Sequence, residues 1–186
     1  MVLGVDDGPF NRRLDRKSLI IGTMMRLDFK IEAILTREIV VDGEDVTPVI
    51  ASMVDSKHGQ EIDLIVTNGV TFAGMNILDI DSLNEKTGVP VISVSRRIPD
   101  LVAMRLAIEK HSPQKLDQVA SRLSHETFAV ELNSNNKIYA NCTGISAVDA
   151  TLVLRRSCLN GKVPEAVRIS HMIGSAIKFG ESGGKA

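Results

Sequence analysis

Three strand-like segments in a row, with no helix between them, constrain this chain more than any other feature. Residues 2–5 are apolar, residues 18–26 form a second extended segment, and residues 29–41 mix charged and apolar side chains in rough alternation. Such alternation is typical of a β-strand with one exposed face. Three strands joined by short links predict an antiparallel meander. A Rossmann or flavodoxin-like domain is disfavoured, because it needs a helix after its first strand.

Helices and strands alternate after this meander. Thr47 followed by Pro48 marks the start of the first helix, with Thr47 as the N-cap. The further expected elements are helices at residues 48–57, 73–87, 101–111, 113–123, 146–159 and 164–178, strands at 62–66 and 89–94, and a hairpin of 128–132 with 137–140. A meander followed by this alternation predicts a mixed sheet with helices on its faces, which is the ribonuclease H-like arrangement.

The length of the chain favours a single domain, and its net charge bears on how it could bind DNA. A chain of 186 residues can bury about 70% of the surface that its unfolded form exposes. We expect one domain over residues 1–186, with a Gly-rich tail at residues 180–186. The net charge of −1 disfavours a protein that coats DNA tightly. It does not exclude an enzyme that gathers its Arg and Lys side chains on one face.

The cysteines and the apolar segments predict a cytoplasmic protein. Cys142 and Cys158 form no disulfide framework and show no zinc-binding spacing. The chain turns acidic at Asp6 and Asp7, which is too early for a signal peptide. No apolar run approaches the roughly 18 residues of a membrane span. We therefore expect a reducing compartment and no membrane partner.

The strongest chemical signal is the segment GVDDGPF at residues 4–10. Asp6 and Asp7 stand where a buried strand leaves the sheet. Consecutive strand residues point to opposite faces, so only one of the two needs to face a cleft. Hard cations such as Mg²⁺ are often held by one or two carboxylates together with substrate phosphate. Asp-Gly-Pro is also common turn chemistry, so a metal site and a plain turn both stay open.

Two other acidic residues are candidates for the same site. Asp45 stands at a helix start, where capping or the helix dipole explains it. The same place can lie beside the ends of the central strands, where Asp45 would join Asp6. Asp79 stands in a predicted helix, and an exposed helix face is the plain interpretation for it.

A segment rich in small and apolar residues follows the strand that ends near Asn68. Gly69 and Gly74 allow the backbone to approach a ligand or another element closely. The segment at residues 70–76, which contains Phe72 and Asn76, is therefore either the floor of a nucleotide cleft or a place of close helix packing.

Basic side chains lead to two further expectations. Arg96 and Arg97 follow a strand at the carboxyl edge of the sheet, where open α/β sheets bind ligands. Arginine pairs well with phosphate, although two solvated surface arginines fit the pattern equally. The histidines show no metal-ligand spacing, so we expect a structural role for each. They are His58, His111, His125 and His171.

Together these segments resemble a known family over nearly the whole chain. The segments that carry the resemblance are residues 4–10, 41–47, 69–80, 89–100, 163–171 and 180–186. They look like the archaeal endonuclease dU family, once described only as uncharacterised and related to endonuclease V. The resemblance implies a ribonuclease H-like domain that acts on DNA.

The more distant likeness to endonuclease V shows where this chain departs from that enzyme. A Gly-x-Asp on its first strand begins the metal site, and Asp6 matches that aspartate. A later strand there ends in Asp-Gly, whereas this chain has Asn68 before Gly69. Arg96 stands where endonuclease V has a lysine. Its catalytic histidine has no counterpart at residues 141–146.

The resemblance implies an endonuclease, dependent on Mg²⁺ or Mn²⁺, that repairs DNA containing uracil or hypoxanthine. The implied metal ligands are Asp6, Asp7 and Asp45, and the implied catalytic residues are these three with Asp79. The implied substrate-binding residues are Asn68, Gly69, Phe72, Gly74, Asn76, Arg96 and Arg97. DNA is the expected partner, while RNA as a substrate and a homodimer stay open. A non-catalytic binding protein for nucleic acid or nucleotides is the alternative, and a small-molecule phosphohydrolase is a third.

Overall fold

The computed structural model describes the whole chain except residues 112, 114–115, 117–124, 134–135, 160 and 184–186. Most of the helix predicted at residues 113–123 and the last part of the tail predicted at residues 180–186 lie outside the described residues. In the described part of the chain, no helix is both long and apolar enough to span a membrane.

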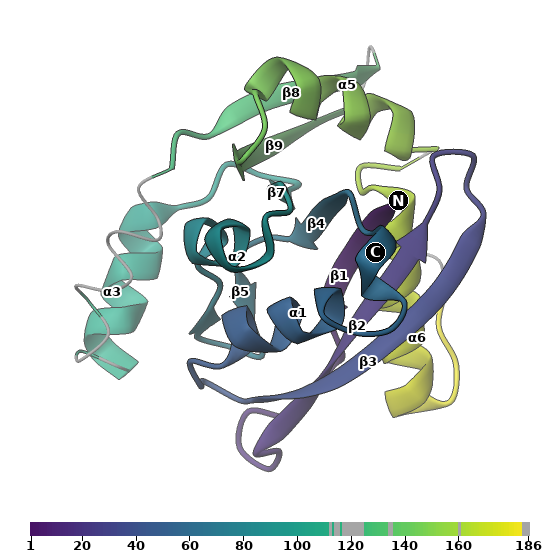
Figure 1. The fold of residues 1–186 in the computed structure, drawn as a ribbon. Helices are drawn as coiled ribbons and strands as arrows, with labels where there is room; N and C mark the ends of the chain where they lie inside the picture. Colours follow the sequence, from purple (N-terminus) through teal and green to yellow (C-terminus); the bar gives the residue numbers. More distant parts are fainter. Residues whose placement is uncertain (112, 114–115, 117–124, 134–135, 160, 184–186) are drawn as a thin grey trace.

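A seven-stranded mixed sheet forms the centre of the fold (Figure 1). The strands lie in the order β3-β2-β1-β4-β7-β9-β8. Their bounds are β1 Val2–Asp7, β2 Lys17–Met25, β3 Ile31–Val40, β4 Leu64–Asn68, β7 Val91–Ser95, β8 Phe128–Asn133 and β9 Asn136–Thr143. Strands β1, β2 and β3 form an antiparallel meander, and β4 and β7 run parallel to β1. The predicted mixed sheet is confirmed.

Helices cover both faces of this sheet. In Figure 1, α1 and α2 lie in front of the sheet and α6 lies behind it. Helix α5 packs on β8 and β9. The bounds are α1 Val46–Val54, η1 Gly59–Glu61, α2 Ile80–Thr87, α3 Leu101–His111, α5 Ala147–Ser157 and α6 Glu165–Phe179. The layered arrangement predicted from the alternation of helices and strands is therefore present.

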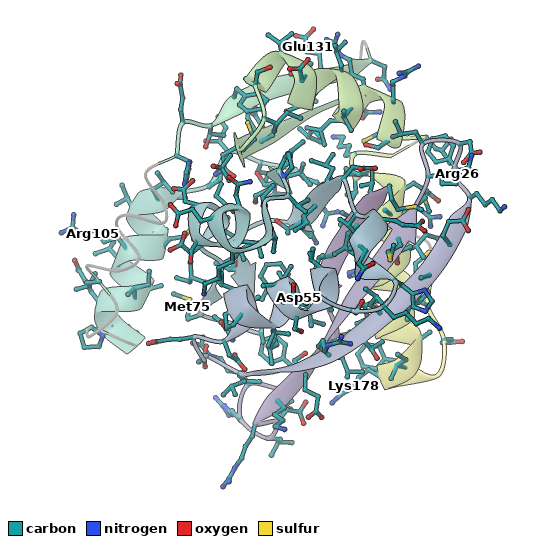
Figure 2. The ribbon with its side chains drawn as sticks, viewed as in Figure 1. Arg26, Asp55, Met75, Arg105, Glu131 and Lys178 are labelled. Atoms are coloured by element: carbon teal, nitrogen blue, oxygen red, sulfur yellow. The ribbon has the colours of Figure 1, made fainter. Side chains whose placement is uncertain are left out.

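The alternation of side chains along each strand divides the core into two layers. On β1, Leu3 and Val5 belong to the layer under α1 and α2, whereas Val2 belongs to the layer under α5 and α6. Ile65 and Val66 divide in the same way on β4. Apolar side chains fill both layers (Figure 2). Because the central strands are buried on both faces, polar side chains reach solvent or a ligand at the strand ends.

One predicted helix is wrong over its first half. We expected a helix at residues 73–87, but α2 begins only at Ile80. A short hairpin of β5 (Thr71–Phe72) and β6 (Asn76–Ile77) precedes it. Ala73 and Gly74 at the hairpin turn have φ angles of 39° and 89°. This left-handed backbone is incompatible with a continuing helix.

Candidate active site

Asp6 and Asn68 come from the carboxyl ends of two neighbouring parallel strands. Val5 of β1 lies opposite Thr67 of β4, so the next residue of each strand reaches the same edge of the sheet. The Nδ2 of Asn68 donates a hydrogen bond to Oδ1 of Asp6 at 3.1 Å. The structure thus brings these two residues together at one edge of the sheet.

His171 supplies a second partner of Asp6 from the other end of the chain. Its Nδ1 lies 2.9 Å from Oδ2 of Asp6. The His171 side chain is 33% exposed, whereas that of Asp6 is only 4% exposed. The hydrogen bond to Asp6 raises the pKa of His171, while burial and the charge of Arg96 oppose this effect. Because Nδ1 is engaged, Nε2 is the ring nitrogen left to exchange a proton with water or substrate.

Small residues let α6 approach β1 closely enough for this contact. A Cβ on Gly4 would overlap the backbone of Ala166 in α6. Ser170, which precedes His171, donates a hydrogen bond to the carbonyl oxygen of Gly4 at 2.8 Å. The hydroxyl of Ser170 also lies 2.8 Å from that of Thr23 on β2. These buried hydrogen bonds fix the rotation of α6, and His171 therefore faces the strand ends.

Asp7 leaves β1 on the face opposite Asp6, as the alternation predicted. The backbone N–H of Ala73 donates to Oδ2 of Asp7 at 2.6 Å. Burial raises the pKa of Asp7 to about 6, the charge of Asp6 adds to this rise, and the hydrogen bond from Ala73 opposes it. Such a strongly shifted carboxyl group is frequent at functional sites. A cation nearby would relieve the repulsion between the two carboxylates.

The donor atoms at this edge fit a hard divalent cation. A carboxylate offers about four lone-pair positions, so the two hydrogen bonds made by Asp6 leave acceptor capacity. Mg²⁺ and Mn²⁺ prefer oxygen ligands, and Mg²⁺ usually takes one or two carboxylates, with water and substrate phosphate as its other ligands. Within the described residues, no three His, Cys, Asp or Glu side chains are grouped to hold an ion. A cation bound here would therefore depend on substrate or water for part of its coordination.

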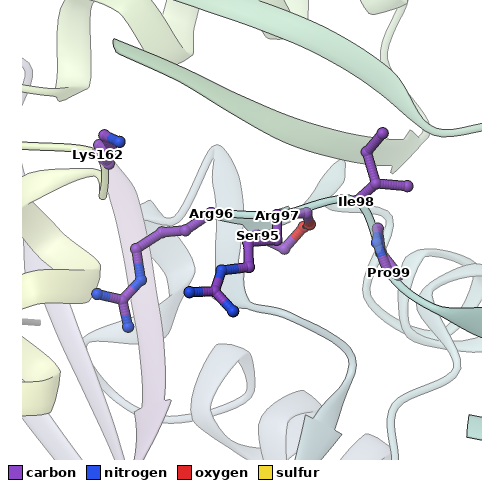
Figure 3. Close-up of a pocket in the computed structure, with 6 residues that line it drawn as sticks. All are labelled: Ser95, Arg96, Arg97, Ile98, Pro99 and Lys162. Carbon is purple, nitrogen blue, oxygen red and sulfur yellow. The ribbon is translucent and has the colours of Figure 1, made fainter. Parts of the chain in front are cut away.

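A basic pocket of about 670 Å³ opens at the end of β7. Arg96, Arg97 and Lys162 line it, together with Ser95, Ile98 and Pro99. Figure 3 shows both guanidinium groups pointing away from Ile98 and Pro99, with Lys162 on a separate segment of the chain. The charge of Arg96 reaches His171, since it lowers the pKa of that residue. The pocket therefore belongs to the same edge as Asp6, and its charge suits phosphate.

Asp45 and Asp79 form hydrogen bonds that stabilise the starts of helices and their connections. Asp45 occupies the N-cap position of α1, where we had expected Thr47. Its Oδ1 accepts a hydrogen bond from Nδ2 of Asn76 at 2.6 Å. Asp79 caps α2 by accepting a hydrogen bond from the backbone N–H of Ser82 at 2.9 Å. Their part in metal binding and catalysis stays a prediction.

The segment expected to form the cleft floor is only partly accessible. The side chains of Phe72 and Asn76 are fully buried. Gly74 lies against a neighbouring carboxylate, with no space for a Cβ. Gly69 and Val70 instead line a small pocket. A Cβ on Gly69 would meet nothing within 4 Å. A substrate-binding role for Gly69, Phe72, Gly74 and Asn76 stays a prediction.

Sequence reasoning missed the place of His171, for which we had expected a structural role. The helical spacing of residues along 165–179 contains the information that could have placed His171 on the buried face of this helix. Val167 and Gly174 both pack against the sheet, and they stand four residues before and three residues after His171. Residues at this spacing share one face of a helix. What the period alone could not reveal is which strand that face meets.

Comparison with known sequences finds close relatives in archaea. The family model described as endonuclease dU matches residues 1–178. A UPF0215 protein of Methanopyrus kandleri is 38% identical over 192 residues, which cover 100% of this chain and 94% of that protein. A UPF0215 protein of Thermococcus kodakarensis is 34% identical over 184 residues, covering 97% and 93% respectively.

Comparison with solved structures finds the same fold. A protein of unknown function from Archaeoglobus fulgidus has a TM-score of 0.81 and 32% sequence identity, covering 95% of this chain and 96% of that chain. Endonuclease V of Ciona intestinalis, in complex with a 24-mer DNA containing an inosine followed by a ribo-adenosine, has a TM-score of 0.59. It is 11% identical and covers 91% of this chain and 81% of that chain. At that identity the likeness shows the fold alone.

Proposed function

This chain belongs to the endonuclease dU family, and from that premise we propose that it is a metal-dependent endonuclease for DNA containing deaminated bases. The observation that carries the proposal is Asp6, held between Asn68 and His171 at the edge where the basic pocket opens. A carboxylate centre beside a pocket lined by cationic side chains suits phosphodiester hydrolysis. The inosine DNA bound to endonuclease V, whose fold this chain shares, supports hypoxanthine, the base of inosine, as a damaged base, and the description of the family as endonuclease dU supports uracil.

In this proposal the carboxylates bind the metal ion and the basic side chains bind the DNA strand. Asp6 would hold Mg²⁺ or Mn²⁺, with Asp7 adding negative charge from the opposite face of β1, and the ion when bound activates water and stabilises charge on the phosphate oxygens. The basic pocket, formed by Arg96, Arg97 and Lys162, would hold the strand by its phosphates. Such positioning contributes to the rate because the scissile phosphate is held beside the reacting groups.

His171 is the group that would supply a proton to the leaving oxygen. Attack of water on the phosphorus breaks the ester bond, and the departing oxygen then needs a proton. The hydrogen bond that His171 donates to Asp6 raises the pKa of His171, so a larger fraction of the ring is protonated near neutral pH. His171 would thus supply a catalytic histidine, which residues 141–146 lack.

A nicking assay on labelled duplexes tests the proposed function. One duplex carries a single uracil, one a single hypoxanthine and one no damage, each with Mg²⁺, with Mn²⁺ and with EDTA. We expect cleavage that needs the metal and is confined to the damaged duplexes, and we expect Asp6→Asn to abolish it. If folded wild-type protein leaves every duplex intact, the proposed function is wrong.

The role of His171 is tested by a pair of histidine variants. His171→Ala should lower the nicking rate by about 10²–10⁴-fold, which is the usual contribution of a general acid. His58→Ala is the matched control, because His58 is exposed and precedes the short helix η1, outside the site. Equal nicking rates for the two variants would show that His171 has no part in the reaction.

A non-catalytic nucleic-acid-binding protein is the second candidate. Asn68 favours it, because an amide carries no negative charge to hold a metal where the resemblance implies an aspartate. Retention of DNA in EDTA, without nicking in any metal, would identify such a protein.

A further inference from the structure

A second, smaller pocket adjoins the basic pocket at the same edge of the sheet. The two pockets share Ser95 and Pro99. The smaller pocket is further lined by Gly69, Val70, Ser93, Thr127, Tyr139, Ala140 and Asn141. Gly69 directly follows Asn68, so this pocket begins beside the partner of Asp6. A nucleotide with its phosphate in the basic pocket would have its base at the entrance of the smaller one.

Asn141 brings an unpaired hydrogen-bond acceptor to the wall of this pocket. Its Oδ1 is buried and has no hydrogen-bond partner among the described residues. Buried polar atoms are nearly always paired, because an unpaired one destabilises the fold. Asn141 lies on β9 opposite Ser93 of β7, so the sheet holds its backbone in place. A rigidly held, unpaired acceptor in a pocket wall is suited to a ligand that donates a hydrogen bond.

We propose that the smaller pocket takes a base extruded from DNA and that Asn141 reads the pairing edge of that base. This inference rests on the proposed function and names its specificity-determining residue. Uracil and hypoxanthine each carry a ring N–H beside a carbonyl group. Cytosine and adenine, their parent bases, carry a ring acceptor beside an amino group. Oδ1 of Asn141 accepts a hydrogen bond from the ring N–H, which the parent bases lack.

The pocket has to open before a base can enter. It encloses about 30 Å³, which is close to the space of one water molecule. Pro99 and Thr127 stand on irregular connecting segments, which can move without breaking a strand. Asn141 and Ser93, by contrast, are fixed in the sheet. A pocket that opens only as far as needed also disfavours thymine, which has the pairing edge of uracil and an additional methyl group.

Binding of single-stranded oligonucleotides in EDTA tests this inference without flipping or cleavage. Two fluorescent oligonucleotides differ only in one central uracil or cytosine, and anisotropy measures their Kd values. Wild-type protein should bind the uracil strand about tenfold more tightly, which is typical of a good base contact. Asn141→Leu should bring the two Kd values together and leave the Kd for the cytosine strand unchanged, because the basic pocket is intact.

A control variant and a stability measurement separate base reading from a structural role. Thr143→Val alters a residue on the same strand and the same face, outside the pocket, and should keep the preference for uracil. Asn141→Leu should not lower the Tm, because it removes an unpaired acceptor. A clear fall in Tm would show that Asn141 has a structural role and would overturn the inference.

The outcomes distinguish this inference from the proposed function. If wild-type protein nicks the uracil duplex but shows no preference in binding, or if Asn141→Leu keeps the preference, base reading by Asn141 is wrong and the endonuclease stands. If wild-type protein nicks nothing yet prefers uracil through Asn141, the endonuclease is wrong and the base-reading pocket stands.

Discussion

Burial raises the pKa of Asp7 from 3.8 to about 6, and this single carboxyl group links stability to pH. The folded protein binds the proton of Asp7 more tightly than the unfolded chain does. The contribution of this proton to the free energy of unfolding is therefore fully present below about pH 4 and is lost as the pH rises from about 4 to 6. The shift corresponds to at most about 3 kcal/mol. Asp7 thus destabilises the protein at neutral pH, as residues selected for function often do.

Asp7→Asn should make the protein more stable at neutral pH. The amide keeps an oxygen to accept the hydrogen bond from Ala73 and carries no charge. We expect the free energy of unfolding at pH 7 to rise by about 1–3 kcal/mol, and the difference from wild type to disappear near pH 4. Urea unfolding at both pH values measures this. Asp28→Asn, at an exposed turn, should change stability by less than about 0.5 kcal/mol. A less stable Asp7→Asn protein at pH 7 would contradict the argument.

The sequence predicted those site residues whose place follows from a strand end. Asp6 and Asn68 end buried apolar runs, and parallel strands bring such ends together. His171 escaped prediction because its role depends on how α6 is rotated on β1. That rotation is set by contacts between residues far apart in the chain, such as the hydrogen bond from Ser170 to Gly4. No local pattern contains them.

At the scale of elements, the close contact between β1 and α6 determines whether the site forms. Gly4→Ala would push a methyl group into the backbone of α6. We expect a loss of about 1–3 kcal/mol in the free energy of unfolding, measured by denaturant titration. Because the helix must move, His171 should also leave Asp6, and nicking should fall further than the unfolded fraction explains.

Gly161→Ala is the matched control for this glycine substitution. A Cβ on Gly161 would lie 3.8 Å from the backbone nitrogen of Val163, which is an ordinary contact. Stability and nicking should therefore stay close to those of wild type. If Gly4→Ala behaves like Gly161→Ala, the tight packing of α6 is not needed for the site.

Elements that depend on neighbouring residues in the sequence were predicted correctly, whereas an element held by distant residues was not. The meander and the alternating helices appeared in local periodicity and in the strand ends, so they were predictable. The hairpin of β5 and β6 was not, because distant partners hold its turn. The backbone N–H of Ala73 donates to Asp7, and its carbonyl oxygen accepts a hydrogen bond from the N–H of Asp42. Read locally, the same residues favour a helix.

At the scale of the whole molecule, attraction to DNA has to come from the arrangement of charge. The net charge is −1, so the chain as a whole does not attract a polyanion. The basic pocket gathers three cationic side chains at one edge of the sheet. Binding to DNA should therefore be local and sensitive to salt.

Removal of one charge from the basic pocket should change the salt dependence of DNA binding by a defined amount. Arg97→Gln should lower the slope of log K against log salt by about 0.7–0.9, as expected for one lost phosphate contact. Anisotropy titrations over a series of salt concentrations measure the slope. Lys30→Gln is the control, because Lys30 lies at the β2–β3 turn, at the opposite end of β1 from Asp6. If Lys30→Gln lowers the slope as much as Arg97→Gln does, the basic pocket does not hold DNA.

The hydrogen bond between Asp6 and His171 joins residues that are 165 positions apart. A ribosome adds about 5–20 residues per second, so roughly 8–30 s separate the synthesis of the two. During that interval the nascent strand β1 has neither its covering helix nor its histidine. The proposed cutting activity would therefore arise only after α6 has been synthesised and has packed on β1.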